Sequence, residues 1–198
     1  MIRRLPLVPT ILVALAVATM IGLGIWQLGR AREKEALLER YRAAQNRPPI
    51  AFPTLPVGKE LPLFRYATAV CLRPVSKRAT AGRNRAGETG YVHIVECSTG
   101  AEGPGLAVEV GWSRDPNARF AWSGGPVSGI IAPDRKMRMR LVAASAPAGL
   151  APSAPPDVAQ IPNNHRSYAA QWFLFAAIAL IIYALALRQR WKKESPKA

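Results

Sequence analysis

The sequence predicts two transmembrane helices, one near each end, around a mostly β, α+β soluble domain. No charged residue lies between Arg4 and Arg30. A second uncharged run lies between Arg166 and Arg188. Both runs exceed the roughly 20 apolar residues that a helix needs to cross a bilayer. The chain between them is basic and contains short stretches of alternating apolar and polar residues, which are typical of half-buried strands.

The first apolar run has two interpretations. Arg3 and Arg4 precede it and residues 16–18 read Ala-Val-Ala, as in a cleaved signal peptide. The run continues to Leu28, however, which is longer than the apolar region of about 7–15 residues in a signal peptide. We therefore expect an uncleaved transmembrane helix over residues 7–29, which continues as a charged helix over 30–45 until the prolines after Arg47 end it.

The second apolar run predicts a transmembrane helix over residues 167–187. Short basic tails, 1–6 and 188–198, flank the two spans, and such tails remain in the cytoplasm. Residues 30–166 should then lie on the outer side of the membrane. Their basic character does not contradict this, because loops longer than about 60 residues are translocated largely regardless of charge.

The middle of the chain predicts a β domain over residues 50–145. Strand patterns cover 64–72, 91–97 and 106–112, and weaker ones cover 126–132 and 138–144. Glycine-rich turns at 82–90 and 100–105 separate them, so we expect a small antiparallel sheet or barrel. Residues 146–162 are dominated by alanine and proline and should form an extended strap back to the membrane.

The net charge limits the class of binding partner, and the cysteine content limits the possible disulfides. The net charge is +15, and the middle segment is basic even without the two tails. On the outer side such a surface favours anionic membrane lipids or an acidic membrane partner rather than nucleic acid. Cys71 and Cys97 are the only cysteines, and they form either a disulfide or two buried thiols.

No catalytic signature is visible, since the sequence contains no Walker loop, GxSxG, HExxH or GxGxxG pattern. Of the two histidines, His93 lies in a predicted strand, where packing or a hydrogen bond is expected. His165 lies where the second helix begins, with Tyr168 and Trp172 three and seven residues later. These three residues form either an interfacial aromatic belt or a haem site with His165 as iron ligand, and spacing alone favours the belt.

Two amides lie at the margins of the apolar runs. Gln27 follows Trp26 in the first helix, and Gln171 precedes Trp172 in the second. A polar side chain at this depth finds a partner on another helix or on a ligand, unless it only anchors the helix at the interface.

Four segments resemble the surfeit-locus cytochrome c oxidase assembly family. They are Gly22-Leu-Gly-Ile-Trp-Gln-Leu-Gly-Arg30, Gly90-Tyr91, Gly111-Trp112 and Pro162-Asn-Asn-His-Arg-Ser-Tyr-Ala-Ala-Gln-Trp-Phe173. The resemblance implies two spans around an outer domain and a non-catalytic role in the assembly of respiratory complex IV. It also implies that the protein, like bacterial members, lies in the bacterial inner membrane, binds haem a and helps deliver it to the oxidase core subunit. Other partners would be haem a synthesis or assembly factors and membrane lipids.

The resemblance also suggests roles for individual residues. His165 corresponds to the family histidine and would be the axial ligand of haem iron. Trp26 and Gln27 match the motif of the first span, and the loop after Trp112 departs from the family pattern. The expected haem site therefore consists of His165 with Trp26, Gln27, Tyr168, Gln171 and Trp172, while Arg30 or Arg166 pairs with a haem propionate. The alternatives are a cofactor-free membrane scaffold that holds oxidase subunits or other assembly factors and, less favoured, a membrane enzyme with an undetected site.

Overall fold

The computed structural model describes residues 5–54, 60–100 and 105–194. The chain forms two compact units. One comprises residues 1–37 and 162–198, and the other comprises residues 38–161.

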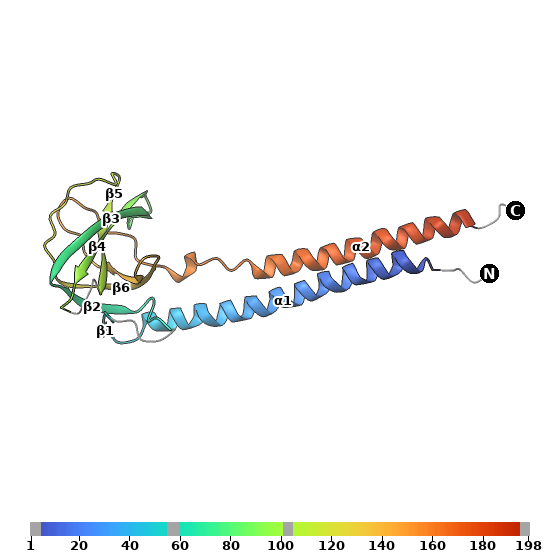
Figure 1. Ribbon diagram of the computed structural model, residues 1–198, viewed down its shortest axis with the longest axis horizontal. Helices are drawn as coiled ribbons and strands as arrows, with labels where there is room; N and C mark the ends of the chain where they lie inside the picture. The colour runs from blue at the N-terminus through green and yellow to red at the C-terminus, as the bar shows by residue number, and fades with distance from the viewer. Residues whose placement is uncertain (1–4, 55–59, 101–104, 195–198) are drawn as a thin grey trace. The chain divides into compact units, whose positions relative to one another are not determined.

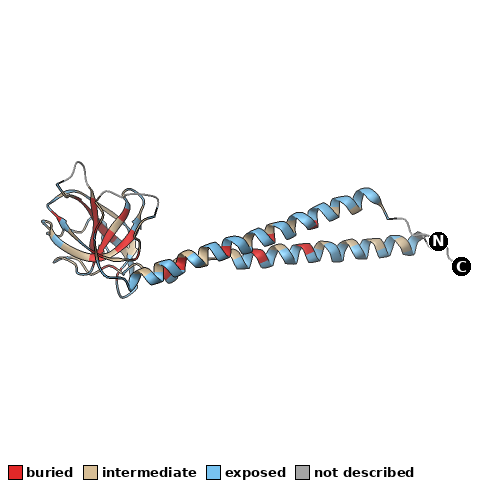
Figure 2. Cartoon of the chain, turned by 90° about the horizontal axis from the view of Figure 1, so that it is seen from below, coloured by how far each residue is buried: buried red, intermediate tan, exposed pale blue. Residues whose placement is uncertain are grey.

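The first unit is a pair of long helices, α1 (Leu7–Gln45) and α2 (His165–Glu194), of which α1 continues into the second unit. The helices lie side by side and run in opposite directions (Figure 1). The hydroxyl groups of Thr10 and Tyr183 form a hydrogen bond between them. Both helices are long and apolar enough to cross a membrane, and most of their surface is exposed (Figure 2). Such exposed apolar surface indicates a membrane protein, because it would be costly in water.

Small residues line the contact between the two helices. In the part of α1 that belongs to this unit, the buried positions Val17, Gly24 and Ala31 recur every seventh residue. In α2 the buried positions are Ala169 and Ala176, which have the same spacing. Seven-residue spacing keeps one face of a helix directed at its neighbour. Small side chains there allow two helix backbones to approach closely.

The second unit is built on a mixed sheet of seven strands in the order β1-β2-β6-β7-β5-β4-β3. Pairs β1–β2 and β5–β7 are parallel, and the other neighbouring pairs are antiparallel. The predicted fold class is therefore confirmed, with an open mixed sheet in place of a closed barrel. The strands are β1 (Ile50–Ala51), β2 (Tyr66–Cys71), β3 (Arg73–Arg83), β4 (Thr89–Ser98), β5 (Leu106–Ser113), β6 (Gly125–Asp134) and β7 (Arg138–Ala143).

A disulfide between Cys71 and Cys97 shows how strongly this sheet curls. Three strands separate β2 from β4 in the sheet order, yet the two Cα atoms are 5.2 Å apart. The Leu72 N–H also donates to the Ser98 carbonyl at 3.0 Å. The sheet therefore wraps around a core whose largest fully buried side chains include Ile94, Leu106, Ile131, Met139 and Leu141. Of the two states left open by the sequence, the structure has the disulfide.

Strand β3 was not predicted from the sequence. It carries several cations, is exposed at many positions and overlaps the predicted turn at 82–90. The turn itself occupies residues 84–88, with Gly87 at φ +83. Residues 146–162 are largely extended, with a turn at 147–150, where Gly149 has φ +90, and a short helix η1 (Val158–Gln160). Isolated bridges join this segment to the sheet unit at Asn84–Ser153 and Trp112–Ala151.

Candidate functional site

His165 is the first residue of α2, and its side chain contacts α1. The carbonyl of the preceding residue, Asn164, accepts a hydrogen bond from the Tyr168 N–H at 3.1 Å, so Asn164 is the N-cap of the helix. The Nδ1 atom of His165 lies 2.7 Å from the side-chain oxygen Oε1 of Gln27. Two of the residues selected from the sequence, 138 positions apart, are thus in direct contact.

Gly24, about one helical turn before Gln27, lets the two helices pack closely enough for this contact to form. A Cβ atom added to Gly24 would lie 2.5 Å from Cε1 of Phe173. Gly22, two residues earlier, has no atom within 4 Å of such a position. Gly24 therefore faces α2 and lets it approach, while Gly22 faces away. The sequence motif contains both glycines, but only the packing shows which of them matters.

The two candidate arginines already hold carboxylates. Arg166 forms a two-point ion pair with Glu35, with Nε–Oε1 at 2.9 Å and Nη2–Oε2 at 3.2 Å. Arg30 pairs with Glu33 on its own helix. Planar, two-point pairing with a carboxylate is the geometry that guanidinium groups favour. Arg166 thus already binds a carboxylate in the arrangement that a propionate would need.

The aromatic candidates and Gln171 do not come together around His165 as Gln27 does. Trp26 is 56% exposed and Tyr168 is 50% exposed. Trp172 is half-buried and meets Phe175 edge-on, with ring centroids 6.2 Å apart. Gln171 is exposed. The structure thus brings together His165 and Gln27, and it leaves Trp26, Tyr168 and Gln171 on open surface, so the site as a whole stays a prediction.

The other histidine, His93, belongs to the sheet unit. Its Nε2 lies 2.7 Å from the Ser113 hydroxyl, which donates its own proton to the Asp115 carbonyl at 2.5 Å. His93 therefore donates to Ser113. Burial lowers the pKa of His93, although the Asp115 carbonyl opposes this shift. The loop after Trp112 thus has a structural role in this chain, because it holds the buried imidazole.

A cluster of buried carboxylates, paired with more exposed cations, lies on the sheet and was not predicted from the sequence. Asp134 accepts a hydrogen bond from Arg78 at 2.6 Å, and Glu109 accepts one from Arg140 at 2.7 Å. Glu96 pairs with Lys136 at 2.7 Å. Arg78 lies on β3, which was not predicted. A predicted strand over 73–83 would have been needed to place Arg78 beside these carboxylates. Each carboxylate has a cation, so the cluster is a structural network.

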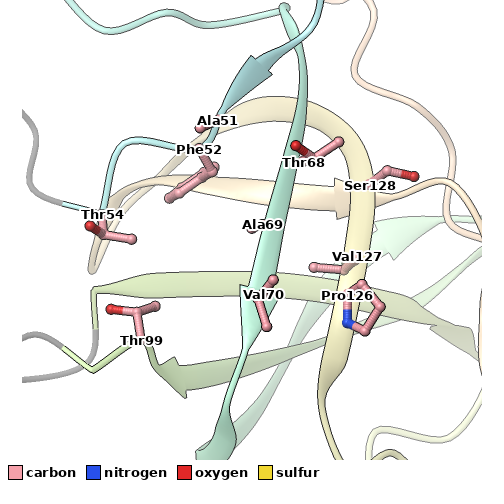
Figure 3. A pocket seen from close by; sticks show the side chains of 10 residues that line it. All are labelled: Ala51, Phe52, Thr54, Thr68, Ala69, Val70, Thr99, Pro126, Val127 and Ser128. Carbon is pink, nitrogen blue, oxygen red and sulfur yellow. The ribbon is translucent and has the colours of Figure 1, made fainter.

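The sheet unit also has a pocket of about 550 Å³ beside β1, β2 and β6 (Figure 3). Its ten lining residues are apolar or carry a hydroxyl group, among them Phe52, Thr68 and Val127. None of them is a residue type that ligates haem iron or pairs with a propionate. Among the described residues, no group of three or more His, Cys, Asp or Glu side chains is placed to hold a metal ion.

The chain has two apolar helices, a contact between an imidazole and an amide within that helix pair, and a sheet that contains a disulfide. These features indicate a membrane protein with two spans. The chain belongs to the SURF1 family, whose model matches residues 14–177. That match covers most of the chain, including Gln27 and His165. A comparison with curated proteins found no match. The family is known for cytochrome c oxidase assembly, and its members are assembly factors rather than catalysts.

Proposed function

We propose that the protein binds haem a and assists its insertion into the core subunit of cytochrome c oxidase. His165 would be the protein ligand of the iron. The observation that carries this proposal is the hydrogen bond from His165 Nδ1 to Gln27, because histidines that ligate metals typically donate their second ring N–H to a neighbouring acceptor.

The surroundings of His165 suit a haem. The porphyrin is largely apolar, and both helices that meet at His165 contain a long apolar stretch. Trp26 and Tyr168 expose aromatic rings on which a macrocycle can pack, and Trp172 adds a half-buried one. Arg30 and Arg166 supply guanidinium groups for the propionates. A single imidazole also suits a carrier, since only one protein–iron bond must break for the haem to leave.

The proposed location is the bacterial inner membrane, with the sheet unit in the periplasm and both termini in the cytoplasm. Basic tails support this orientation, because short basic segments stay inside. The Cys71–Cys97 disulfide supports it independently, since disulfides persist in oxidising compartments. The partners proposed are the oxidase core subunit, haem a synthesis or assembly factors, and membrane lipids.

Chemical rescue tests the ligand role. His165→Gly should lose bound haem a when the protein is purified from cells that make this haem, and added imidazole should restore the absorption spectrum. Tyr183→Phe, at the other end of the helix pair, serves as a control and should keep its haem. Unchanged haem binding in His165→Gly would overturn the ligand assignment. A wild-type protein that carries no haem but co-purifies with oxidase subunits would instead support a cofactor-free scaffold.

A further inference from the structure

We propose that Gln27 is a positioning residue for His165. Its amide oxygen keeps the imidazole proton on Nδ1 and thereby leaves Nε2 as the atom that binds iron. This inference rests on the proposed haem site and adds to it the identity of the ligating nitrogen and the residue that selects it.

The chemistry of the two groups defines the direction of the hydrogen bond. A carbonyl oxygen accepts hydrogen bonds and cannot donate them. Because Gln27 Oε1 lies 2.7 Å from His165 Nδ1, the proton between them belongs to Nδ1. A neutral imidazole has one N–H, so Nε2 then carries a free lone pair. That lone pair would be the one available to haem iron.

The Gln27 amide needs a hydrogen-bond partner at its position in α1. Gln27 lies in an apolar helix and is partly buried, and an amide without a partner there would cost free energy. The nearby arginines do not compete for its oxygen, since Arg30 is held by Glu33 and Arg166 by Glu35. The amide oxygen is therefore left for the imidazole.

The hydrogen bond also joins ligand binding to helix pairing. The ligand is on α2 and the acceptor that orients it is on α1, so the oriented imidazole exists only while the two helices are packed together. Removing such a supporting acceptor typically weakens metal binding roughly 10- to 100-fold. Separation of the helices would have the same effect and would favour release of the haem.

The first experiment uses the full chain without haem, in detergent or lipid nanodiscs at about pH 8, where an ordinary imidazole is neutral. Heteronuclear NMR of protein labelled at histidine distinguishes the protonated from the unprotonated ring nitrogen. The chain contains only two histidines, so His165→Ala identifies the signal of His165.

We expect the Nδ1–H form of His165 in the wild type and in Gln27→Glu, which retains an acceptor. Gln27→Leu should lose that preference. Gln189→Leu, the same substitution at an exposed position of α2, should behave as the wild type does. An Nε2–H form in the wild type would overturn the inference, because it would mean that the amide presents its NH₂ group to the ring. An unchanged tautomer in Gln27→Leu would overturn it as well.

The second readout is haem a affinity. Gln27→Leu should bind haem a roughly 10- to 100-fold more weakly than Gln189→Leu does. Gln27→Glu should retain binding and lower the iron reduction potential, since a carboxylate draws the Nδ1 proton more strongly. Equal affinities of Gln27→Leu and Gln189→Leu would overturn the positioning role while His165 could still be the ligand. Failure of the wild type to bind haem a would refute the proposed function without changing the tautomer result.

Discussion

At the scale of single residues, the proposed site assigns different tasks to the two ring nitrogens of His165. Nδ1 contacts Gln27, and Nε2 would be the nitrogen that binds iron. The sequence singled out both residues, one from its position at the start of a span and the other as an amide in an apolar run. It did not show that they meet, because the register between helices more than a hundred residues apart depends on which side chains pack between them.

Glu35 forms an ion pair with Arg166, whose guanidinium group would otherwise be free to pair with a haem propionate. Glu35→Gln should therefore strengthen haem a binding. The ion pair with Arg166 is exposed, and such pairs contribute at most about 1 kcal/mol, so the gain should be up to about fivefold. Optical titration of the purified protein with haem a measures it. Glu39→Gln, which removes a similar exposed carboxylate paired with Arg42, is the control. Weaker binding in Glu35→Gln, or the same gain in both variants, would contradict a role for Arg166.

The buried carboxylates of the sheet unit predict a loss of stability in acid. The hydrogen bond from Lys136 lowers the pKa of Glu96 below its usual value of 4.5 against the effect of burial. Burial would raise the pKa of Asp134, but the hydrogen bonds from Arg78 and the Met137 N–H outweigh it and hold this pKa below 3.8. A carboxylate with a lowered folded-state pKa stabilises the fold fully above its unfolded-state pKa and loses that contribution as the pH falls through the folded-state value.

Stability should therefore fall below about pH 4.5, which near-UV circular dichroism during denaturant unfolding can follow. In Asp134→Asn the protein should be less stable at neutral pH, and its stability should depend less on pH in this acid range. A variant as steeply acid-sensitive as the wild type would show that Asp134 does not contribute to the loss.

At the scale of elements, the contact between the helices depends on which small residues face the neighbouring helix. Gly24→Leu should force α1 away from Phe173, because overpacking a close contact typically costs about 1–3 kcal/mol. It should thereby weaken the Gln27–His165 hydrogen bond and reduce haem content. Gly22→Leu is the matched control, since nothing lies within 4 Å of a Cβ added there. Equal haem content in the two variants would show that this packing does not support the site.

The Cys71–Cys97 disulfide links strands β2 and β4 covalently across the curled sheet. It closes a loop with a sequence separation of 26, which corresponds to a stabilisation of roughly 3.5 kcal/mol in the chain-entropy model. Replacing both Cys71 and Cys97 by alanine should lower the free energy of unfolding of the sheet unit by about this amount. Denaturant unfolding monitored by tryptophan fluorescence would measure the change. Unfolding at the same denaturant concentration as the wild type would contradict a stabilising role.

Strand prediction succeeded where apolar residues alternate, as in β4 and β5, and failed at β3. That strand is rich in arginine and lysine and lies at the edge of the sheet, so little of its stability comes from an apolar face. The buried charge network was missed for the same reason. Its cation Arg78 lies on the strand that the sequence did not reveal, and its carboxylates are far apart along the chain.

At the scale of the whole molecule, composition was enough for the fold class. Two uncharged runs predicted the helices, and alternating stretches predicted the β-rich middle. The strand order could not be predicted from the sequence, because it places β6 between β2 and β7 and makes two pairings parallel. Such long-range pairings leave no local signal. From the sequence the candidate site was accessible only as a set of residues, chosen by their positions at the ends of the spans and by the family motif. The packing then showed that His165 and Gln27 are in contact.

The measurement that tests the central claim most directly is the haem a content of the full-length protein purified from cells that produce this haem. Wild-type protein should carry haem a with a histidine-ligated spectrum. His165→Ala should carry almost none, while its near-UV circular dichroism still shows a folded sheet unit. Wild-type protein free of haem a, or a His165→Ala variant with the wild-type haem content and spectrum, would contradict the account.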